Sequence, residues 1–179
     1  MKINFTDFPT YFSVQEYDAA ITKMVDILSG NKDILSIFQV GGVSSPGISD
    51  IDFYVIFKNE CQFLHNPVAN LTFPANYFFS HRLFGTCEKF AVDFEKYTFF
   101  RSYKLLAGQN INMLNYDLNE SDIQILQHQI ALEYLIKAWL NISISLIYKE
   151  VKVRDLLLHA RPFCMTSNFS LLKMKSSKE

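Results

Sequence analysis

The chain has 179 residues, of which 49% are hydrophobic, including 17 Phe and 9 Tyr. This length allows one ordinary domain, or a compact domain with an added helical segment, and the apolar content is ample for a buried core. With 17 basic and 18 acidic residues the formal net charge is -1. That balance argues against a protein held on nucleic acid by bulk positive charge, and it disfavours a long nucleic acid as a partner.

Cysteine usage and hydropathy indicate a cytoplasmic protein without a membrane partner. The three cysteines lie far apart and form no CxxC pair, which favours reduced thiols over disulfides or a zinc site. The N-terminal stretch MKINFTDFPT lacks the apolar core of a signal peptide. The most membrane-like stretch, 130–148, contains Glu133 and Lys137, which would be costly in hydrocarbon.

The first predicted element in chain order is a helix over 13–29, because its apolar residues recur at three- and four-residue spacing. Ser13 followed by Glu16 fits a capping box, and Gly30 is a natural stop after the last turn. A short apolar run over 34–40 then predicts a strand.

A second strand is predicted over 51–57, where a dense apolar run suits a strand covered on both faces. Residues 58–75 contain two prolines and are expected to form a loop. Two further strands are predicted over 76–84 and 89–97, with a Gly-Thr turn between them.

After these strands the hydrophobic pattern becomes helical. We predict a helix over 99–107, a long helix over 121–147 and a short helix over 153–160. The last of these ends before Pro162, because the residue that precedes a proline is disfavoured in a helix. This order predicts an α+β fold class, in which a mixed β-sheet is flanked by helices and followed by a helical C-terminal segment.

The predicted elements divide the chain into three parts. Residues 1–115 form the domain that contains the sheet, residues 116–163 form the helical C-terminal segment, and residues 164–179 form a flexible tail that ends in the polar stretch KMKSSKE.

The segment between the first two predicted strands, GGVSSPGISDID, contains three of the six glycines of the chain. Glycine lets backbone N–H groups approach an anion closely, where a Cβ would block it. Ser44 and Ser45 add hydroxyl donors. The segment is therefore a candidate phosphate-binding loop, and a plain glycine-serine loop is the alternative interpretation.

The same segment ends in a pair of aspartates. Side chains alternate along a strand, so Asp50 and Asp52 project to the same side. Two neighbouring carboxylates repel each other unless a cation lies between them. Mg²⁺ in particular is bound by one or two carboxylates together with substrate phosphates. Hydrogen-bond donors for phosphate, followed by a pair of carboxylates, favour metal-dependent phosphoryl or nucleotidyl transfer. An Asp-x-Asp sequence that occurs by chance is the alternative interpretation.

The run FQVGGVSSPGISDIDFYVI resembles the signature of the DNA polymerase β-like nucleotidyltransferase superfamily. In that family a strand ends in Gly-Gly or Gly-Ser, a loop follows, and Ser-Asp-hydrophobic-Asp opens the next strand. The loop is shorter here than in many members, and Gly42 stands where most have serine, a role that Ser44 or Ser45 would then take. The resemblance implies phosphate contacts from five residues, which are Gly41, Gly42, Ser44, Ser45 and Ser49.

The family also uses a third carboxylate on a later strand, between hydrophobic neighbours. Asp93 lies between Val92 and Phe94 in this context, while Glu95 on the same strand face is the competing candidate and Glu88 a weaker one. The resemblance thus implies three catalytic metal ligands, Asp50, Asp52 and Asp93, with Asp93 acting also as the base near the attacking hydroxyl. A lone aspartate on an exposed strand face is the alternative for Asp93.

Two classes of function follow from this resemblance. The first is an enzyme that uses two Mg²⁺ ions, or Mn²⁺, to move a nucleoside monophosphate, AMP above all, from a nucleoside triphosphate to a hydroxyl of a small molecule, a protein or an RNA end. The second is a nucleotide-binding regulatory or antitoxin-like module that pairs with a helical partner protein or forms a homodimer. The helix over 121–147 is a candidate interface for a helical partner, and packing of this helix on the chain's own sheet is the favoured alternative. A third interpretation is a nucleotidyltransferase fold that keeps the aspartates but has lost catalytic activity.

Overall fold

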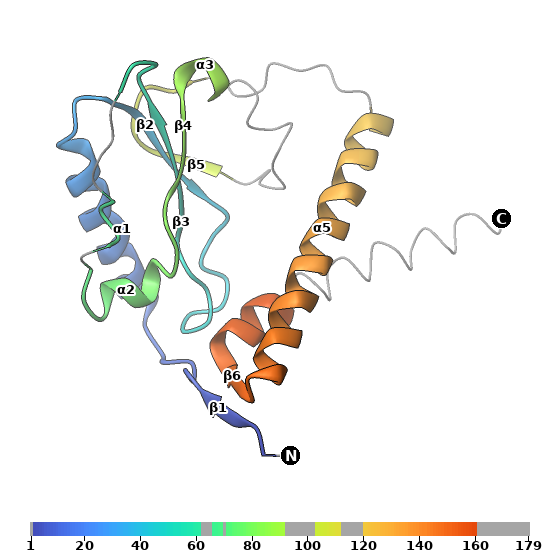
Figure 1. The fold of residues 1–179 in the computed structure, drawn as a ribbon. Helices are drawn as coiled ribbons and strands as arrows, with labels where there is room; N and C mark the ends of the chain where they lie inside the picture. Colours follow the sequence, from blue (N-terminus) through green and yellow to red (C-terminus); the bar gives the residue numbers. More distant parts are fainter. Residues whose placement is uncertain (1, 62–65, 70, 92–102, 112–119, 161–179) are drawn as a thin grey trace. The chain divides into compact units, whose positions relative to one another are not determined.

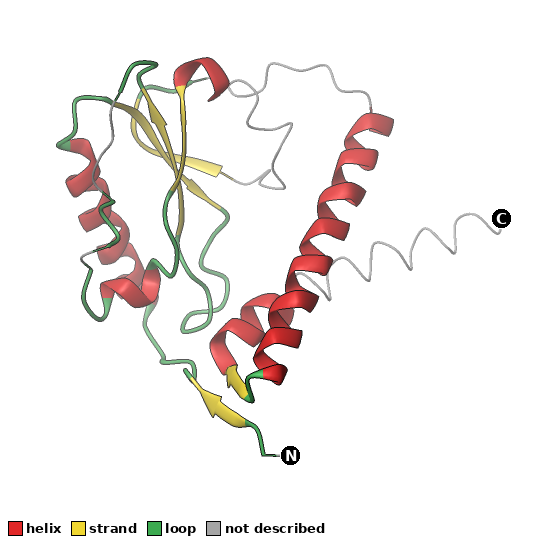
Figure 2. Cartoon of the chain, in the orientation of Figure 1, coloured by secondary structure: helices red, strands yellow, loops and turns green. Residues whose placement is uncertain are grey.

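The computed structural model describes residues 2–61, 66–69, 71–91, 103–111 and 120–160. Helices and strands are interspersed along this part of the chain, with β2 followed directly by β3 (Figures 1 and 2), and the predicted α+β class is confirmed. The chain divides into two compact units, the larger made of residues 12–118 and the smaller of residues 1–11 with residues 119–179. The first eleven residues therefore group with the C-terminal part of the chain, and the tail predicted over 164–179 lies outside the described residues.

The larger unit contains a four-stranded sheet in the order β4-β3-β2-β5. Its strands are β2 (Ile34–Val40), β3 (Asp52–Phe57), β4 (Phe84–Cys87) and β5 (Tyr103–Gly108). β2 runs antiparallel to both β3 and β5, whereas β3 and β4 run parallel, so the sheet is mixed. β2 has the predicted bounds, and β3 begins one residue later than predicted.

Helix α1 (Val14–Ser29) begins with the capping box that the sequence predicts. The Glu16 N–H donates to Ser13 Oγ at 3.3 Å, and the Ser13 N–H donates to the Glu16 carboxylate at 2.8 Å. These two bonds satisfy backbone donors that the first turn of a helix leaves without partners. Gly30 follows the last turn as its C-cap, as predicted.

Both faces of the sheet are covered by apolar side chains, as the dense apolar run of β3 predicts. Phe53 and Val55 pack with α1 and α2 (Ala75–Phe78) on one face. Tyr54 and Ile56 face the opposite side, where α3 (Glu88–Ala91) contributes Ala91. All four β3 side chains are buried, and this packing holds β3 in a fixed position from which the segment before it is presented.

Three elements predicted between residues 76 and 107 are wrong or only partly described. The strand predicted over 76–84 is replaced by α2 and irregular chain, because the consecutive aromatics Tyr77, Phe78 and Phe79 are buried against α1 and β3 instead of alternating along a strand. The strand predicted over 89–97 begins as α3, and its remainder lies outside the described residues.

The helix predicted over 99–107 is also wrong, because β5 occupies Tyr103–Gly108. Tyr103 and Leu105 pack in the cluster on the second face of the sheet, and β5 makes a ladder with β2. Backbone pairing with a neighbouring strand therefore overrides the local helical pattern of this apolar run.

The smaller unit contains the long helix α5 (Glu120–Ile147) and a helix over 153–160, and both confirm the sequence prediction. Between them, β6 (Glu150–Lys152) pairs in parallel with β1 (Asn4–Thr6). The sequence predicts neither strand, because three residues carry too little periodicity to be recognised. Among the described residues, no helix is long and apolar enough to cross a membrane.

Gly108 provides a test of the sheet. Its φ is +89°, and a Cβ there would collide with the backbone carbonyl of Leu35, whereas nothing lies within 4 Å of a Cβ on Gly42. We predict that Gly108→Ala destabilises the protein by about 3 kcal/mol or more, because backbone cannot yield as a side chain can. Gly42→Ala should change stability by less than about 1 kcal/mol. Urea unfolding of the two variants measures the difference, and equal stabilities would contradict the position of β5.

Candidate metal centre

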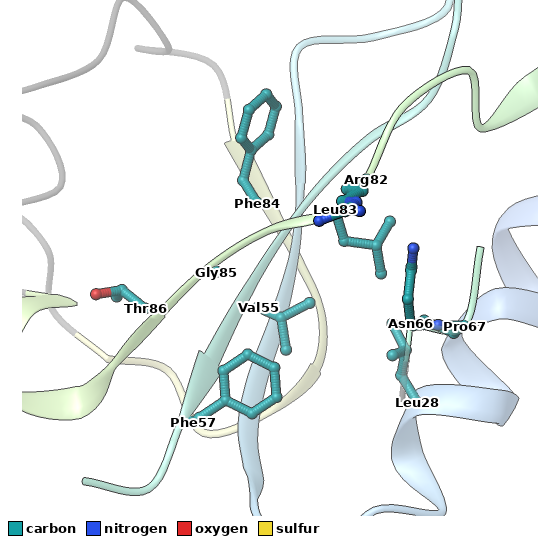
Figure 3. A pocket seen from close by; sticks show the side chains of 10 residues that line it. All are labelled: Leu28, Val55, Phe57, Asn66, Pro67, Arg82, Leu83, Phe84, Gly85 and Thr86. Carbon is teal, nitrogen blue, oxygen red and sulfur yellow. The ribbon is translucent and has the colours of Figure 1, made fainter. Parts of the chain in front are cut away.

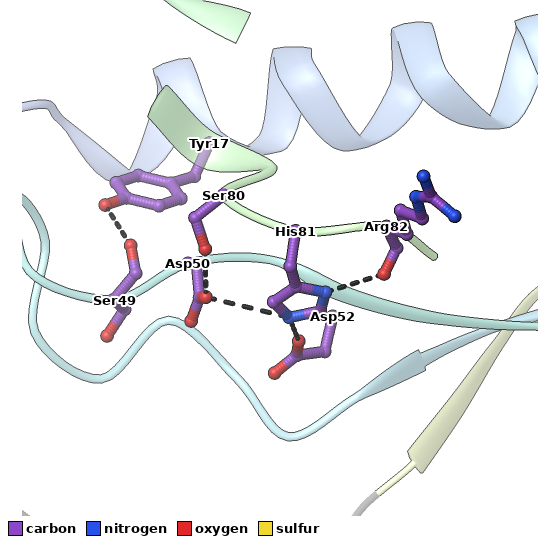
Figure 4. A network of polar contacts seen from close by, with 7 residues as sticks. All are labelled: Tyr17, Ser49, Asp50, Asp52, Ser80, His81 and Arg82. Carbon is purple, nitrogen blue, oxygen red and sulfur yellow. Dashed lines mark hydrogen bonds and ion pairs between the residues drawn. The ribbon is translucent and has the colours of Figure 1, made fainter. Parts of the chain in front are cut away.

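The candidate site lies at one end of the sheet, and the direction of the strands explains why its residues meet there. β3 and β4 run parallel, with Tyr54 opposite Phe84, so the residues that lead into these two strands lie at the same end. β2 runs the other way and ends at Val40, opposite Asp52. The glycine loop, the aspartate pair and the segment before β4 therefore converge, and Figure 4 shows the polar contacts that they make.

Three side chains at this end offer ligand atoms for a metal ion. One atom from each of Asp50, Asp52 and His81 lies within 4.8 Å of the other two. The His81 Nε2 is 2.6 Å from Asp52 Oδ1 and 3.8 Å from Asp50 Oδ2. The two carboxylates are half-buried and the imidazole is 40% exposed, so the group is accessible from solvent while the chain holds it in place.

Neighbouring groups orient the members of this cluster. The Ser80 hydroxyl donates to Asp50 Oδ2 at 2.6 Å. The other ring nitrogen of His81, Nδ1, lies 2.6 Å from the Arg82 carbonyl oxygen, which can only accept. Residues 80–82 thus fix both the Asp50 carboxylate and the plane of the imidazole (Figure 4).

His81 carries a proton on both ring nitrogens in this arrangement, because each faces an oxygen acceptor. The pKa of His81 is raised to about 9, chiefly by the hydrogen bond to Asp52; burial opposes this increase, and the bond to the Arg82 carbonyl and the charges of Asp52 and Asp50 contribute to it. The resulting imidazolium supplies the positive charge that two adjacent carboxylates require.

Two tyrosine hydroxyls hold the loop that leads to Asp50. The buried Tyr17 hydroxyl donates to the Ser49 carbonyl at 2.8 Å and accepts from the Gly47 N–H at 3.1 Å. The Tyr77 hydroxyl donates to the Gly47 carbonyl. Because Tyr17 lies on α1 and Tyr77 on α2, the helices that cover one face of the sheet also fix the position of this loop.

The predicted phosphate-binding residues lie in two different environments. Gly41 and Gly42 are exposed, and Gly41 has a φ of +66°, which suits glycine. Ser49 is buried, and its hydroxyl accepts from the Ser45 N–H at 3.1 Å, so these groups hold the loop together. Ser44 lies between the glycines and that turn and is exposed. The exposed part of the loop is therefore its first half.

The structure brings together two of the three predicted carboxylates. Asp50 and Asp52 converge as predicted, while Asp93 and its competitor Glu95 lie outside the described residues. Glu88 follows β4 directly, at the opposite end of that strand from His81, so it is not a member of this cluster.

His81 is the member of the cluster that the sequence analysis misses. It lies in a segment that the sequence predicts as a strand of its own, with no indication of which strand it adjoins. The one available signal is a polar His-Arg pair directly before an apolar strand. Its significance depends on β4 lying parallel to β3, and local sequence does not specify that pairing.

A pocket of about 470 Å³ lies beside β4, between that strand and α1 (Figure 3). Its lining is mostly apolar and includes Leu28, Val55 and Leu83, with Arg82 among the polar residues. Neither Asp50 nor Asp52 lines the pocket, so it is separate from the carboxylates, although Arg82 lines the pocket and its carbonyl contacts His81.

Comparison with known proteins gives no match to a family model, to a curated protein or to a solved structure. What the site can do chemically follows from its own groups. Two carboxylates and one imidazole around a common point are a donor set for a divalent cation. An exposed glycine turn at the end of the adjacent strand offers backbone N–H groups to an anion.

Removal of the Tyr17 hydroxyl tests the anchoring of the loop. Tyr17→Phe leaves the buried Ser49 carbonyl and Gly47 N–H without this partner, and we expect a loss of about 1–3 kcal/mol of stability. Tyr11→Phe, at a side chain that is 79% exposed, should change stability by less than about 0.5 kcal/mol. Urea unfolding compares the two variants. A Tyr17→Phe variant as stable as its Tyr11→Phe control would contradict the anchoring.

The raised pKa of His81 predicts how stability depends on pH. The unfolded chain releases this proton near pH 6.5, whereas the folded protein holds it to about pH 9. The contribution of His81 is therefore complete below pH 6.5, decreases between pH 6.5 and pH 9 and is absent above that range. We expect the wild-type unfolding free energy to fall more steeply across this range than that of His81→Gln, as measured by urea unfolding at several pH values. Parallel pH profiles would refute the prediction.

Proposed function

We propose that this chain is a metal-dependent nucleotidyltransferase, which moves a nucleoside monophosphate, AMP above all, from a nucleoside triphosphate to a hydroxyl acceptor. The observation that carries the proposal is the convergence of Asp50 and Asp52 with a third ligand atom at the end of the sheet, next to the exposed glycine turn. This reaction requires a cation held by carboxylates, next to hydrogen-bond donors that contact the phosphate groups.

The order of the elements around the glycine loop, and the contacts that fix this loop, also support the proposal. β2 ends at Val40, the glycine loop follows, and β3 begins at Asp52, which is the order of elements in the nucleotidyltransferase signature that the sequence resembles. Two antiparallel strands hold the loop and the aspartates at one end. Tyr17 and Tyr77 fix the rest of the loop, so the groups are positioned before any substrate binds.

In the proposed reaction, the acceptor hydroxyl oxygen forms a bond to the α-phosphorus, and the bond from that phosphorus to the bridging oxygen breaks, so that pyrophosphate leaves. Asp50 and Asp52 bind the divalent cations, Mg²⁺ or Mn²⁺, that neutralise the phosphate charge. Gly41, Gly42 and Ser44 contact phosphate oxygens. The hydroxyl proton passes to a carboxylate, the role that the resemblance to nucleotidyltransferases implies for Asp93.

A second candidate function is a nucleotide-binding regulatory or antitoxin-like module that pairs with a helical partner protein or a second copy of the chain. The observation in its favour is a set of large apolar side chains that are exposed along α5. Among the described residues these are Ile125, Leu132, Ile136, Trp139, Leu140, Ile144, Leu146 and Ile147. Exposed apolar surface of this kind is typical of an interaction site.

The enzyme proposal is tested by incubating the protein with labelled ATP, GTP, CTP or UTP and Mg²⁺ or Mn²⁺, and by measuring pyrophosphate release and label transfer. We predict that the double variant Asp50→Asn/Asp52→Asn loses at least about 100-fold in rate, because the charge that holds the cation is removed. Circular dichroism and urea unfolding establish that this variant is folded.

The matched control is Asp18→Asn/Asp26→Asn, which removes two exposed carboxylates on α1 and should leave the rate unchanged. A wild-type protein that binds no nucleotide with any metal would contradict the proposal. A protein that binds nucleotide without turnover, and that co-purifies with a helical partner, would favour the regulatory module.

A further inference from the structure

We propose that His81 is a direct metal ligand, so that this site binds a first-row transition ion such as Mn²⁺, Co²⁺ or Zn²⁺ in preference to Mg²⁺. The inference rests on the proposed function in placing a cation at Asp50 and Asp52, and it identifies the class of cation and its third protein ligand. The resemblance to nucleotidyltransferases implies carboxylates alone, so the imidazole is a property of this chain.

The distances between the three ligand atoms suit one ion. In six-coordinate geometry with ligands at about 2.1 Å, neighbouring ligand atoms lie about 3 Å apart and opposite ones about 4.2 Å apart. The His81 Nε2 is 2.6 Å from Asp52 Oδ1 and 3.8 Å from Asp50 Oδ2, and all three atoms lie within 4.8 Å of one another. A shift of a few tenths of an ångström between Nε2 and Oδ1 would therefore admit the ion.

The groups around the ligands are those that metal-binding side chains require. A metal-ligating histidine almost always donates its other N–H to a carbonyl, a carboxylate or water, which fixes the ring and directs the free nitrogen toward the metal. His81 has the same placement, because Nδ1 lies against the Arg82 carbonyl oxygen while Nε2 points to the carboxylates (Figure 4). A metal ion that binds there would displace the proton that Nε2 carries in the metal-free protein. Ser80 orients Asp50 in the same way.

The choice of metal follows from the chemistry of the donors. Carboxylate oxygens suit Mg²⁺, Ca²⁺ and Mn²⁺, whereas imidazole suits the later first-row ions. Mg²⁺ is bound through oxygen and retains several waters, so an imidazole nitrogen adds little to its affinity. Two carboxylates with one imidazole therefore favour a transition ion. Water or substrate phosphate can complete the coordination, because the His81 side chain is 40% exposed.

The alternative role for His81 is that of an internal cation, which pairs with Asp50 and Asp52 and is displaced when a metal binds. The two roles predict opposite effects of the same substitution. If His81 is a ligand, its removal weakens the binding of a transition ion. If His81 competes with the metal, its removal strengthens the binding of every divalent cation.

The test is a metal titration of the full chain without nucleotide. Co²⁺ is followed by its visible absorption, Mn²⁺ by electron paramagnetic resonance and Mg²⁺ by competition with Mn²⁺. We expect wild type to bind Co²⁺ and Mn²⁺ at least about 10-fold more tightly than Mg²⁺. His81→Gln should reduce Co²⁺ affinity by at least about 10-fold and change the Co²⁺ spectrum, while Mg²⁺ affinity changes by less than about 3-fold. The control His128→Gln alters an exposed histidine on α5 and should change nothing.

Two results would overturn the inference, namely unchanged or tighter Co²⁺ binding in His81→Gln, or a wild-type preference for Mg²⁺. If either result is found and Asp50→Asn/Asp52→Asn still abolishes metal binding, the proposed function is unaffected. If no metal binds to wild type without nucleotide, this inference fails, whereas the proposed function is decided by the nucleotide assay, in which substrate phosphates help to hold the cation. If His81→Gln does not fold, nuclear magnetic resonance of the wild-type protein provides the test instead. We expect Zn²⁺, but not Mg²⁺, to shift the ¹⁵N resonance of His81 Nε2. An unshifted resonance would contradict ligation.

Discussion

The mutual repulsion of Asp50 and Asp52 is the constraint around which this end of the sheet is organised. The carboxylates are held near each other by a rigid strand and a fixed loop, so a positive group has to lie beside them. The protein provides one in His81, whose ring is held by the Arg82 carbonyl. A metal ion bound by the two carboxylates and His81 would satisfy the same need with greater charge. The arrangement of the site is therefore stable without a ligand and remains suited to bind one.

The position of the loop depends on aromatic residues that also form the core. Tyr17 and Tyr77 are buried among the side chains that pack α1 and α2 on the sheet, and their hydroxyl groups reach the backbone of Gly47 and Ser49. A tyrosine suits this task because its ring is apolar while its hydroxyl can bond to backbone. Stability of the core and geometry of the site consequently cannot vary independently, and a substitution that loosens α1 should also disorder the approach to Asp50.

Sequence patterns predict the first half of the fold well and the middle poorly, for physical reasons. α1, β2 and β3 carry strong local signals, namely a capping box, helical spacing and dense apolar runs. The aromatic run at Tyr77 and the strand β5 depend instead on which surfaces they meet, and that information is not local. The candidate site divides in the same way, since Asp50 and Asp52 are neighbours in sequence, whereas His81 joins them only through the parallel pairing of β3 with β4. Residues from separate segments become a site only when strand order is known.

The pairing of β1 with β6 has a consequence for how the chain folds during synthesis. The larger unit is continuous in sequence, from residue 12 to residue 118, while the smaller unit combines residues 1–11 with residues from 119 onward. The ribosome therefore synthesises every residue of the larger unit before it synthesises β6, so the partner strand of β1 is absent until then. Nascent chains of intermediate length therefore contain β1 without β6, together with all the strands of the four-stranded sheet. This order of synthesis favours early folding of the unit that contains Asp50 and Asp52. Until β6 is synthesised, β1 exposes backbone groups to which chaperones can bind.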